Sequence, residues 1–388
     1  MAAPLEGLKV VELARILAGP WIGQTLADLG AEVIKVEAPE GDDTRKWGPP
    51  FITAADGSRM EAAYFHACNR GKRSVVADFR DPADLAFVRA LIADADVVIE
   101  NFKTGGLRKY GLDYTTLAEL HPRLVYCSVT GFGQNGPYAE RAGYDAMIQG
   151  MGGIMSLTGE PSGEPQKIGV AFADIFTGVY GVIAVQAALA QRERTGLGQH
   201  VDMALLDVMV GVLANQAMNY LVSGDVPVRY GNAHPNIVPY QVCAVADGHV
   251  MLAVGNDGQF QRLCEVLGAT DLAADPRYQT NEGRVVHRAV LMPALGAYLA
   301  TWSRDALLAR LATAAVPAGP INTVGDVFAD AQVCARGMQL ELPAPHVAGG
   351  HLPGVRTPIT FSGAQLATGR PAPRLGEHTE EVRAEYGF

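Results

Sequence analysis

Short apolar runs alternate with amphipathic segments along roughly the first 130 residues of the chain. The apolar runs are rich in β-branched residues and lie at 8–13, 31–37, 74–78, 97–100 and 124–129. Segments with helical spacing lie between them, at 21–29, 82–93 and 114–121. This alternation predicts βαβ units, and therefore an α/β fold with a mainly parallel, Rossmann-like sheet that carries helices on both faces.

An uncharged segment dense in Gly and Ala, 175–191, follows a single acidic residue, Asp174. Its composition predicts a buried helix that packs closely on its neighbours. The acid at its start has two interpretations. Asp174 is either an N-cap, whose oxygen accepts a free backbone N–H, or a nucleophile that the positive helix terminus keeps ionised. This stretch alone does not decide between them.

The composition and periodicity of the sequence change near residue 223. Before it, 203–222 is expected to form one long apolar helix, whereas 223–239 is rich in Gly, Pro and Asn and has no clear period. A strand and three helices follow, which predicts a smaller α+β domain. Because 388 residues are too many for one ordinary core, two domains are expected. The later elements are expected at 249–254, 258–267, 290–301 and 305–314.

Composition narrows the possible functions. The formal net charge of -10 argues against a nucleic-acid-binding protein. The five cysteines include no CxxC pair and the nine histidines form no HxxxH, so we expect neither a disulfide framework nor a metal site. No GxGxxG opens the first helix, which argues against NAD. The N-terminal stretch has no signal-peptide pattern, and we expect a cytoplasmic protein.

The apolar segment 175–191 also raises the question of a membrane span. It falls short of the ~20 apolar residues that a spanning helix needs. It contains Thr177 and Gln186, and the charged segment 192–194 follows it directly. We therefore expect no membrane span.

Cations follow several predicted strands at their carboxyl ends, the edge where open parallel sheets bind ligands. The alternative is that each is a solvated surface charge. On an otherwise acidic chain, such a cluster favours a phosphate-bearing ligand, and Phe79 and Phe102 could flank its base. The cations are Arg15, Arg80, Lys103, Arg108, Lys109 and Arg141.

Seven segments, in this order, resemble the class III CoA-transferases, the group that includes formyl-CoA transferase and carnitine CoA-transferase. They are LEGLKVVELARILAGPWIGQTLADLGAEVIKVE, NRGKRSVVADFRDP, ADVVIENFKTGGLRKYGL, SVTGFGQNGPYAERAGYDAMIQGMGGIMSLTG, GVAFADIFTG, RTGLGQHVDMALLD and PRLGEHTEEV. Four more segments resemble most the succinyl-CoA-dependent dicarboxylate transferases of the glutarate type. These are YGNAHPNIVPYQ, VGNDGQF, TNEGRVVHR and GPINTVGDVF.

The resemblance implies a catalytic role for Asp174, because the family's carboxylate nucleophile falls on it in GVAFADIFTG. The acyl-CoA racemases of the same fold also have an Asp in this segment, which they pair with a His in AGHD. This chain has AGYD there, with Tyr144 in place of the His. The difference favours CoA transfer and leaves a racemase or isomerase as the alternative. A protein that binds CoA without catalysis is a third interpretation, against which the intact Asp174 speaks.

The resemblance also implies the residues that bind CoA and substrate. Tyr144 and Asp145 match a Tyr–acid pair near the thioester, and the glycines of 151–153 are candidate oxyanion donors. For the far carboxylate of a dicarboxylic acid, the candidates by position are Asn232, His234 and Tyr240. A shift of one residue in the alignment with the family would select Arg108 in place of Lys109. Residues that match the CoA site of the family are Arg15, Leu17, Ala18, Ala77, Asp78, Phe79, Arg80, Asn101, Phe102, Lys103 and Lys109.

The family implies a large CoA-binding domain, 1–222 and 325–388, and a smaller domain, 223–324, in an interlocked homodimer. It also implies covalent transfer of CoA through an aspartyl anhydride and an aspartyl-CoA thioester, with succinyl-CoA as the expected donor and no metal or NAD. The sequence leaves the acceptor open among glutarate, itaconate, citramalate, malate and similar acids.

Overall fold

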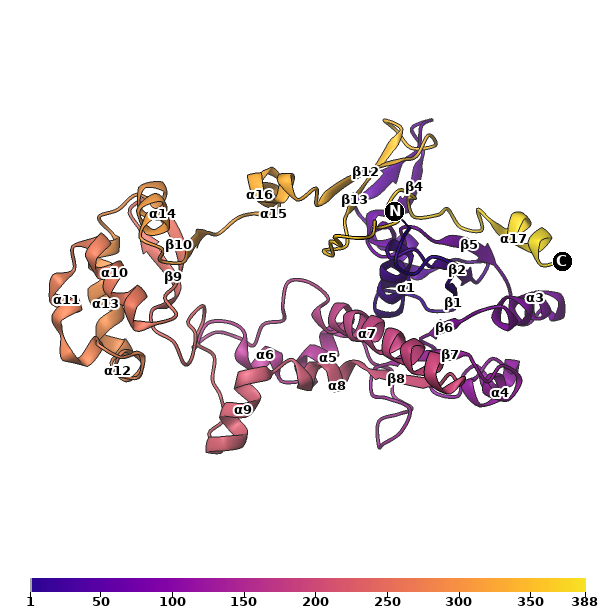
Figure 1. Cartoon of the computed structure of the whole chain (residues 1–388), viewed down its shortest axis with the longest axis horizontal. Helices are drawn as coiled ribbons and strands as arrows, with labels where there is room; N and C mark the ends of the chain where they lie inside the picture. Colours follow the sequence, from indigo (N-terminus) through magenta and orange to yellow (C-terminus); the bar gives the residue numbers. More distant parts are fainter. Residues whose placement is uncertain (1) are drawn as a thin grey trace. The chain divides into compact units, whose positions relative to one another are not determined.

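The computed structural model describes residues 2–388, which form two compact units (Figure 1). The larger unit comprises 2–154, 167–223 and 331–388, and the smaller unit comprises 155–166 and 224–330. Compared with the predicted domains, the first boundary lies one residue later. The smaller unit also extends to residue 330 and takes in 155–166.

A six-stranded sheet organises the larger unit. Its strands are β1 (Lys9–Glu12), β2 (Glu32–Glu37), β5 (Arg73–Val76), β6 (Val97–Glu100), β7 (Val125–Thr130) and β8 (His200–Ala204). Their order is β5-β2-β1-β6-β7-β8, and every neighbouring pair is parallel, which confirms the predicted fold class. The chain runs outward from β1 on one side and returns to β6 on the other. The carboxyl ends of β1 and β6 therefore form a topological switch point, where open sheets bind ligands.

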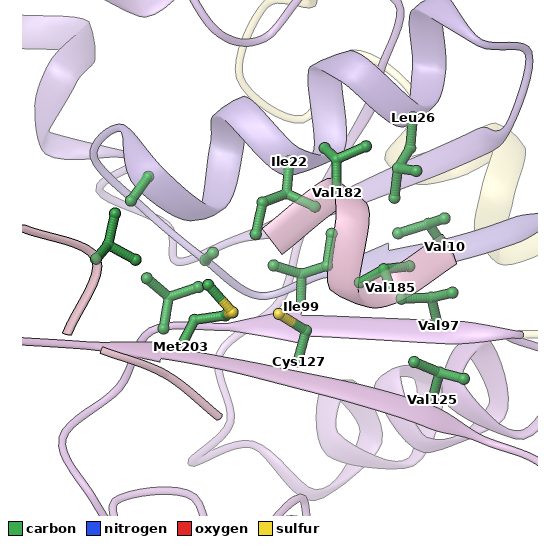
Figure 2. Packing of buried hydrophobic residues seen from close by; sticks show 14 of the residues in the cluster. Val10, Ile22, Leu26, Val97, Ile99, Val125, Cys127, Val182, Val185 and Met203 are labelled. Atoms are coloured by element: carbon green, nitrogen blue, oxygen red, sulfur yellow. The ribbon is translucent and has the colours of Figure 1, made fainter. Parts of the chain in front are cut away.

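Helices cover both faces of this sheet, as expected. They are α1 (Ala18–Asp28), α3 (Pro82–Ala93), α4 (Tyr114–Leu120) and α7 (Phe172–Thr195). Helices α1 and α7 contribute Ile22 and Val185 to a buried cluster with Val97 (Figure 2). Helix α3 contributes Leu91 to the cluster on the opposite face, which contains Val98. Successive residues of β6 thus serve the two cores, because side chains alternate along a strand.

The predicted helix over 203–222 is wrong. Strand β8 continues to Ala204, whose partner in β7 is Thr130. Two helices follow, α8 (Leu205–Gly211) and α9 (Ala214–Ser223), with a bend of 71° between them. Ala214 has a φ of 47° at the break. An apolar run has no period that separates a buried strand from a helix, so the pairing of β8 with β7 decided its structure.

Helix α7 buries one face rather than its whole circumference. Val185 and Ala188 are fully buried, whereas Val179, Tyr180 and Ile183 are exposed. By length and composition alone, α7 is apolar enough to cross a membrane, a property that core helices of soluble proteins share. Its buried face packs against α1, so α7 is a core helix of the larger unit.

Two glycines let α1 and α7 approach closely. A Cβ atom on Gly178 would lie 2.8 Å from Cβ of Trp21, and one on Gly181 would lie 2.4 Å from Cδ1 of Ile22. Both distances are shorter than real side chains tolerate. The dense Gly and Ala pattern of this helix therefore reflects close packing, as the sequence predicted.

Gly178→Ala is expected to lower the free energy of unfolding by about 1–3 kcal/mol, because the added methyl group overpacks the contact with Trp21. Denaturant unfolding measures this change. Gly211→Ala is the matched control, since a Cβ atom at that position would meet nothing within 4 Å. That variant should be neutral or more stable by up to about 1 kcal/mol. Equal destabilisation of the two variants would contradict the packing argument.

Four charged side chains are fully buried in the larger unit: Glu12, Lys35, Asp42 and Lys72. The Nζ atom of Lys35 lies 3.1 Å from Glu12 and 3.1 Å from Asp42, and that of Lys72 lies 2.8 Å from Glu12. Two acids and two lysines balance, so the cluster carries no net charge. Burial of this kind is tolerated only when each charge is paired.

The larger unit also contains short elements near the switch point and a C-terminal extension. They are η1 (Asp43–Lys46), β3 (Phe51–Thr53), β4 (Arg59–Ala62), α2 (Ala63–His66), η2 (Arg108–Tyr110), α5 (Asp145–Met151), α6 (Ile154–Leu157), α16 (Ala331–Ala335), β12 (Gln339–Pro343), β13 (His351–Val355) and α17 (Thr379–Glu385). Helix α6 crosses the boundary between the units at residue 154.

The smaller unit is an α+β structure, as expected. Its antiparallel sheet has the order β11-β10-β9 and forms one core with the helices around it, including Val250, Phe260 and Leu295. The elements are β9 (Tyr240–Val245), β10 (Gly248–Ala253), α10 (Asp257–Leu267), α11 (Thr270–Ala274), η3 (Pro276–Tyr278), α12 (Asn281–Val286), α13 (Arg288–Leu299), α14 (Arg304–Thr313), β11 (Ala318–Pro320) and α15 (Val324–Ala329).

Candidate active site

A cavity of about 450 Å³ lies at the switch point of the larger unit. The turn after β1, the segment after β6, the loop after β7 and the first turn of α7 all contribute to its walls. Asp174 is the acid that α7 contributes. The predicted residues that line this cavity are Arg15, Leu17, Ala18, Asn101, Phe102, Lys103, Lys109, Tyr144, Asp145 and Asp174.

Five predicted CoA-site residues do not line this cavity. Arg108 lines a neighbouring cavity, whereas Lys109 lines this one. Asp78 and Arg80 form an ion pair of 2.7 Å with each other. Phe79 stacks on Phe102 with ring centroids 6.2 Å apart, so it supports a cavity residue from behind. Ala77 is buried in the core of the sheet.

Asp174 is not the N-cap of α7, so that interpretation is wrong. It stands in the first turn, and the N-cap position is occupied by Ala171, whose side chain caps nothing. The capping oxygen comes from another helix. Oδ1 of Asp145 accepts hydrogen bonds from the backbone N–H groups of Ala173 at 2.8 Å and Asp174 at 3.2 Å. Asp145 therefore caps the N-terminal end of α7, and the carboxylate of Asp174 does not cap the helix.

The carboxyl group of Asp174 is poorly solvated. Burial, and secondly the negative charge of Asp145, raise the pKa of Asp174 to about 7. Within residues 2–388, no group donates a hydrogen bond to this carboxylate. Burial and the charge of Asp145 thus outweigh the expected stabilisation of the ionised carboxylate by the N-terminus of α7. A carboxylate that few hydrogen bonds stabilise is a stronger nucleophile when it is ionised.

The turn after β1 is strained and firmly held. Ile16 has a φ of 72°, a left-handed conformation that is a genuine outlier for a β-branched residue. Its N–H donates to both carboxylate oxygens of Asp42, at 3.2 and 3.3 Å. Asn101 accepts from the N–H of Arg15 at 2.9 Å and donates to its carbonyl oxygen at 2.7 Å. The two sides of the switch point are thereby joined across the cavity floor.

Two glycines bring the loop after β7 against the segment that carries Tyr144. A Cβ atom on Gly131 would lie 2.6 Å from Cα of Gly143, so the two backbones touch there. Both glycines line the cavity. The sequence places Gly131 just past the end of a strand but does not reveal its contact with Gly143, although the glycines of GFG and AGYD were a usable signal for a close backbone approach.

Tyr64 is a second residue that sequence reasoning missed. Burial, followed by the charges of Asp174 and then of Cys68 and Asp145, raises the pKa of its phenol to about 12. Its ring packs edge-on against Trp47, with centroids 5.4 Å apart. The phenol is therefore neutral, and the charges of both carboxylates act on it. No motif marks Tyr64, because its proximity to Asp174 arises only from the fold.

The glycines of 151–153 do not supply free oxyanion donors. The N–H of Gly152 donates to the carbonyl oxygen of Ile148 at 2.7 Å, and that of Gly153 donates to Gly150 at 3.4 Å. Both groups serve the end of α5, so this expectation is wrong. Helix α1 begins at Ala18 in the cavity wall. Its N-cap residue is Leu17, whose side chain cannot accept a hydrogen bond from the first backbone N–H groups of the helix. Backbone N–H groups of that turn are better placed to face an anion.

The cations of the cavity suit a phosphate-bearing ligand. Arg15, Lys103, Lys109 and Arg141 all line it. The guanidinium of Arg141 lies over the ring of Tyr138, 4.4 Å from its centroid. Among residues 2–388 no group of three or more His, Cys, Asp or Glu side chains is arranged to hold a metal ion.

The three candidates for acceptor binding lie in the smaller unit. Nδ1 of His234 accepts a hydrogen bond from the N–H of Asn236 at 3.1 Å, and its ring centroid lies 5.3 Å from that of Tyr240. Asn232 precedes them in the same loop. Their proposed contact with substrate stays a prediction.

The sequence matches the family described as CoA-transferase family III over residues 5–379. The chain therefore belongs to this family, and it is an enzyme of the CoA-transferase class, as the resemblance predicted. Asp174, the residue on which the family's nucleophile falls by position, lines the cavity.

Relatives of known name agree with this assignment. The chain is 60% identical over 383 residues to a succinate–glutarate CoA-transferase of Agrobacterium fabrum, covering 98% of this chain and 95% of that protein. It is 39% identical to the human succinyl-CoA:glutarate CoA-transferase, covering 98% and 86%. The crystal structure of a CAIB/BAIF family protein from Brucella suis is 64% identical, covers 100% of both chains and superposes with a TM-score of 0.87.

Proposed function

We propose that this enzyme transfers CoA from succinyl-CoA to a small dicarboxylic acid, with glutarate as the first candidate. The observation that carries the proposal is the carboxylate of Asp174, which accepts no hydrogen bond from residues 2–388 and lies in a cavity bordered by four cations. The names of relatives at 60% and 39% identity support the donor and acceptor. A relative that transfers CoA to mesaconate, at 38% identity, keeps other dicarboxylic acids open.

In the proposed mechanism, ionised Asp174 attacks the thioester carbonyl of the donor and forms a mixed anhydride, while CoA leaves as thiolate. The thiolate attacks the carbonyl carbon of Asp174, which releases succinate and leaves an aspartyl-CoA thioester. The acceptor carboxylate then attacks the thioester carbonyl, the C–S bond breaks, and CoA leaves again as thiolate, which gives a second anhydride between Asp174 and the acceptor. Thiolate finally attacks the acyl carbon of the acceptor and frees Asp174. Each step exchanges one acyl bond for another, so neither ATP nor a redox partner is needed.

The neighbours of Asp174 have separate tasks in this scheme. Asp145 holds the N-terminal end of α7 through two backbone N–H groups, which fixes the position of the nucleophile. Neutral Tyr64 and exposed Tyr144 have hydroxyl groups that can donate to the oxyanion of a tetrahedral intermediate. Arg15, Lys103 and Lys109 would neutralise CoA phosphates.

The direct test is an assay with succinyl-CoA and a panel of acids, analysed by liquid chromatography with mass spectrometry. Glutaryl-CoA and succinate should form in equal amounts, and glutarate should give the highest kcat/KM. Exchange of α-protons in deuterated water without formation of a new thioester would instead support a racemase or isomerase. Binding of CoA with neither reaction would leave only a CoA-binding protein.

Asp145→Asn is expected to extend activity to lower pH. Asp145 raises the pKa of Asp174, and Asn removes that charge while its amide oxygen can still accept the two N–H groups of α7. Because the nucleophile must be ionised, kcat of the native enzyme should fall as pH drops below about 7. The variant should retain several-fold more of its pH 8 rate at pH 6 than the native enzyme does. An unchanged kcat profile would contradict the assigned coupling, and Asp207→Asn is the control.

We also propose a homodimer, as the family resemblance implies. Exposed apolar residues on α7 (Val179, Tyr180 and Ile183) and on α9 (Leu221 and Val222) support it, since such patches usually mark an interface. Sedimentation equilibrium should give twice the mass of the 41.1 kDa chain. A monomer at micromolar concentration would exclude this assembly.

A further inference from the structure

Behind the segment that borders the Asp174 cavity lies a second cavity of about 340 Å³. Strand β6 contributes its last residue, Glu100, β7 contributes Tyr126 and Ser128, and β8 contributes its first residue, His200, on the side of the sheet covered by α4. Lys103, Thr104 and Gly106 line both cavities, so one segment separates them. Nothing in the proposed mechanism uses the second cavity.

The buried acid of this second cavity is Glu100, the last residue of β6, with an exposed fraction of 6%. Its Oε2 atom accepts a hydrogen bond from the backbone N–H of Phe102 at 2.7 Å. Ser128 is its register partner on β7, and the Ser128 hydroxyl lowers the pKa of the Glu100 carboxyl. The hydroxyl of Ser128 also lies 2.8 Å from Nε2 of His200 on β8. Three parallel strands thus share one row of polar side chains that ends at the backbone of Phe102.

The bond from Glu100 to Phe102 acts on the segment that lines the Asp174 cavity. Asn101, Phe102 and Lys103 all face that cavity, and Asn101 ties the segment to the strained turn at Arg15 through two hydrogen bonds. If Phe102 loses its acceptor, its buried N–H must turn elsewhere. The conformation of the predicted CoA-binding segment therefore depends on the carboxylate behind it.

We propose that Glu100 is a positioning residue for CoA binding, which holds segment 101–103 in its binding conformation when the Glu100 carboxyl is ionised and loosens it when that carboxyl is protonated. The inference rests on the proposed function only in taking CoA as the ligand of the Asp174 cavity. An ionised acceptor makes a hydrogen bond about twice as strong as a neutral one. Deprotonation of Glu100 should therefore strengthen the hold on Phe102.

The surroundings of Glu100 place its titration near neutral pH. Burial, and to a smaller extent the negative charge of Asp202, raise the pKa of Glu100 to about 7, against the lowering effects of Ser128 and the N–H of Phe102. Burial lowers the pKa of His200, against the raising effect of Asp202. Burial raises the pKa values of Tyr126 and Cys127, so neither competes for the proton.

The other charged groups of the second cavity are Lys103, Arg108 and Asp113, which line its wall. None of them forms an ion pair with Glu100 among the described residues. Asp113 accepts a hydrogen bond from the hydroxyl of Thr116 at 2.8 Å. This bond does not involve segment 101–103. Asp113 thus offers a matched control, an acid in the same cavity that does not hold the segment.

The test measures the dissociation constant of CoA itself by calorimetry between pH 6 and 8, so it needs no turnover. Native enzyme should bind CoA about three- to tenfold more weakly at pH 6 than at pH 8, as a weakened charge-assisted bond implies. Glu100→Gln keeps an acceptor oxygen but cannot ionise, so its affinity should lie near the native pH 6 value at both pH values. Asp113→Asn should keep the native dependence.

A second variant keeps the proposal falsifiable if Glu100→Gln does not fold. Ser128→Ala removes a hydrogen bond that lowers the pKa of Glu100, so the midpoint of the pH dependence should move to higher pH. In kinetic assays both variants should change KM for the CoA thioester and leave the acid limb of kcat in place, since that limb belongs to Asp174. Native-like pH dependence of CoA affinity in Glu100→Gln or Ser128→Ala would overturn the proposal. Absence of CoA binding by the native chain would instead overturn the proposed function.

Discussion

Asp174→Asn should lower kcat for CoA transfer by on the order of 10⁴-fold or more, because the amide cannot form the anhydride through which every later step passes. The substitution keeps the size of the side chain and the hydrogen bonds that Asp145 accepts from the backbone N–H groups at the start of α7. Affinity for CoA should therefore persist while turnover is lost. Steady-state transfer from succinyl-CoA to glutarate, measured beside CoA binding, separates the two effects.

Asp207→Asn is the matched control for this loss. Asp207 also stands in the first turn of a helix of the larger unit, on α8, and does not line the Asp174 cavity. Its substitution should leave kcat within a factor of about two, the scale of a surface change. Transfer by Asp174→Asn at more than a hundredth of the native rate would contradict nucleophilic catalysis by Asp174.

Glu12→Gln should lower the free energy of unfolding by about 3–5 kcal/mol, the cost of leaving a buried charge without its partner. Glu12 lies within 3.1 Å of Lys35 and 2.8 Å of Lys72, and all three side chains are fully buried. Lys35 keeps Asp42 as a partner, whereas Lys72 retains only neutral acceptors, among them Asn69 at 2.8 Å. Urea unfolding at neutral pH measures the change.

Glu32→Gln provides the comparison for Glu12. Glu32 also pairs with a cation, Arg73 at 2.7 Å, but its side chain is 42% exposed. Loss of such an exposed pair should cost no more than about 1 kcal/mol. Comparable destabilisation by Glu12→Gln and Glu32→Gln would mean that burial does not determine how much the ion pairs of Glu12 stabilise the fold.

The parallel sheet was predictable because its strands are short β-branched runs with helical segments between them. Strands β1, β2, β5, β6 and β7 are largely buried on both faces, so composition alone marked them. The break between α8 and α9 was not predictable in the same way. Strand β8 and both helices share one apolar run, and only the pairing of Ala204 with Thr130 separates strand from helix.

The candidate site was predictable in part. Motif positions located Asp174, Asn101 and Lys109, and the fold brings all three to one cavity. The capping of α7 by Asp145 could not be read from the sequence, because the two residues are 29 positions apart and meet only after α5 and α7 pack. Tyr64 was missed for the same reason, since no local pattern places a short helix beside a distant carboxylate.

The most direct test of covalent catalysis is intact-protein mass spectrometry after incubation with succinyl-CoA and hydroxylamine, with fragmentation to locate the modified residue. The proposed mechanism predicts an aspartyl hydroxamate at Asp174 in the native enzyme and none in Asp174→Asn. An unmodified native protein that still converts succinyl-CoA and glutarate to glutaryl-CoA, or a hydroxamate at another carboxylate, would contradict it.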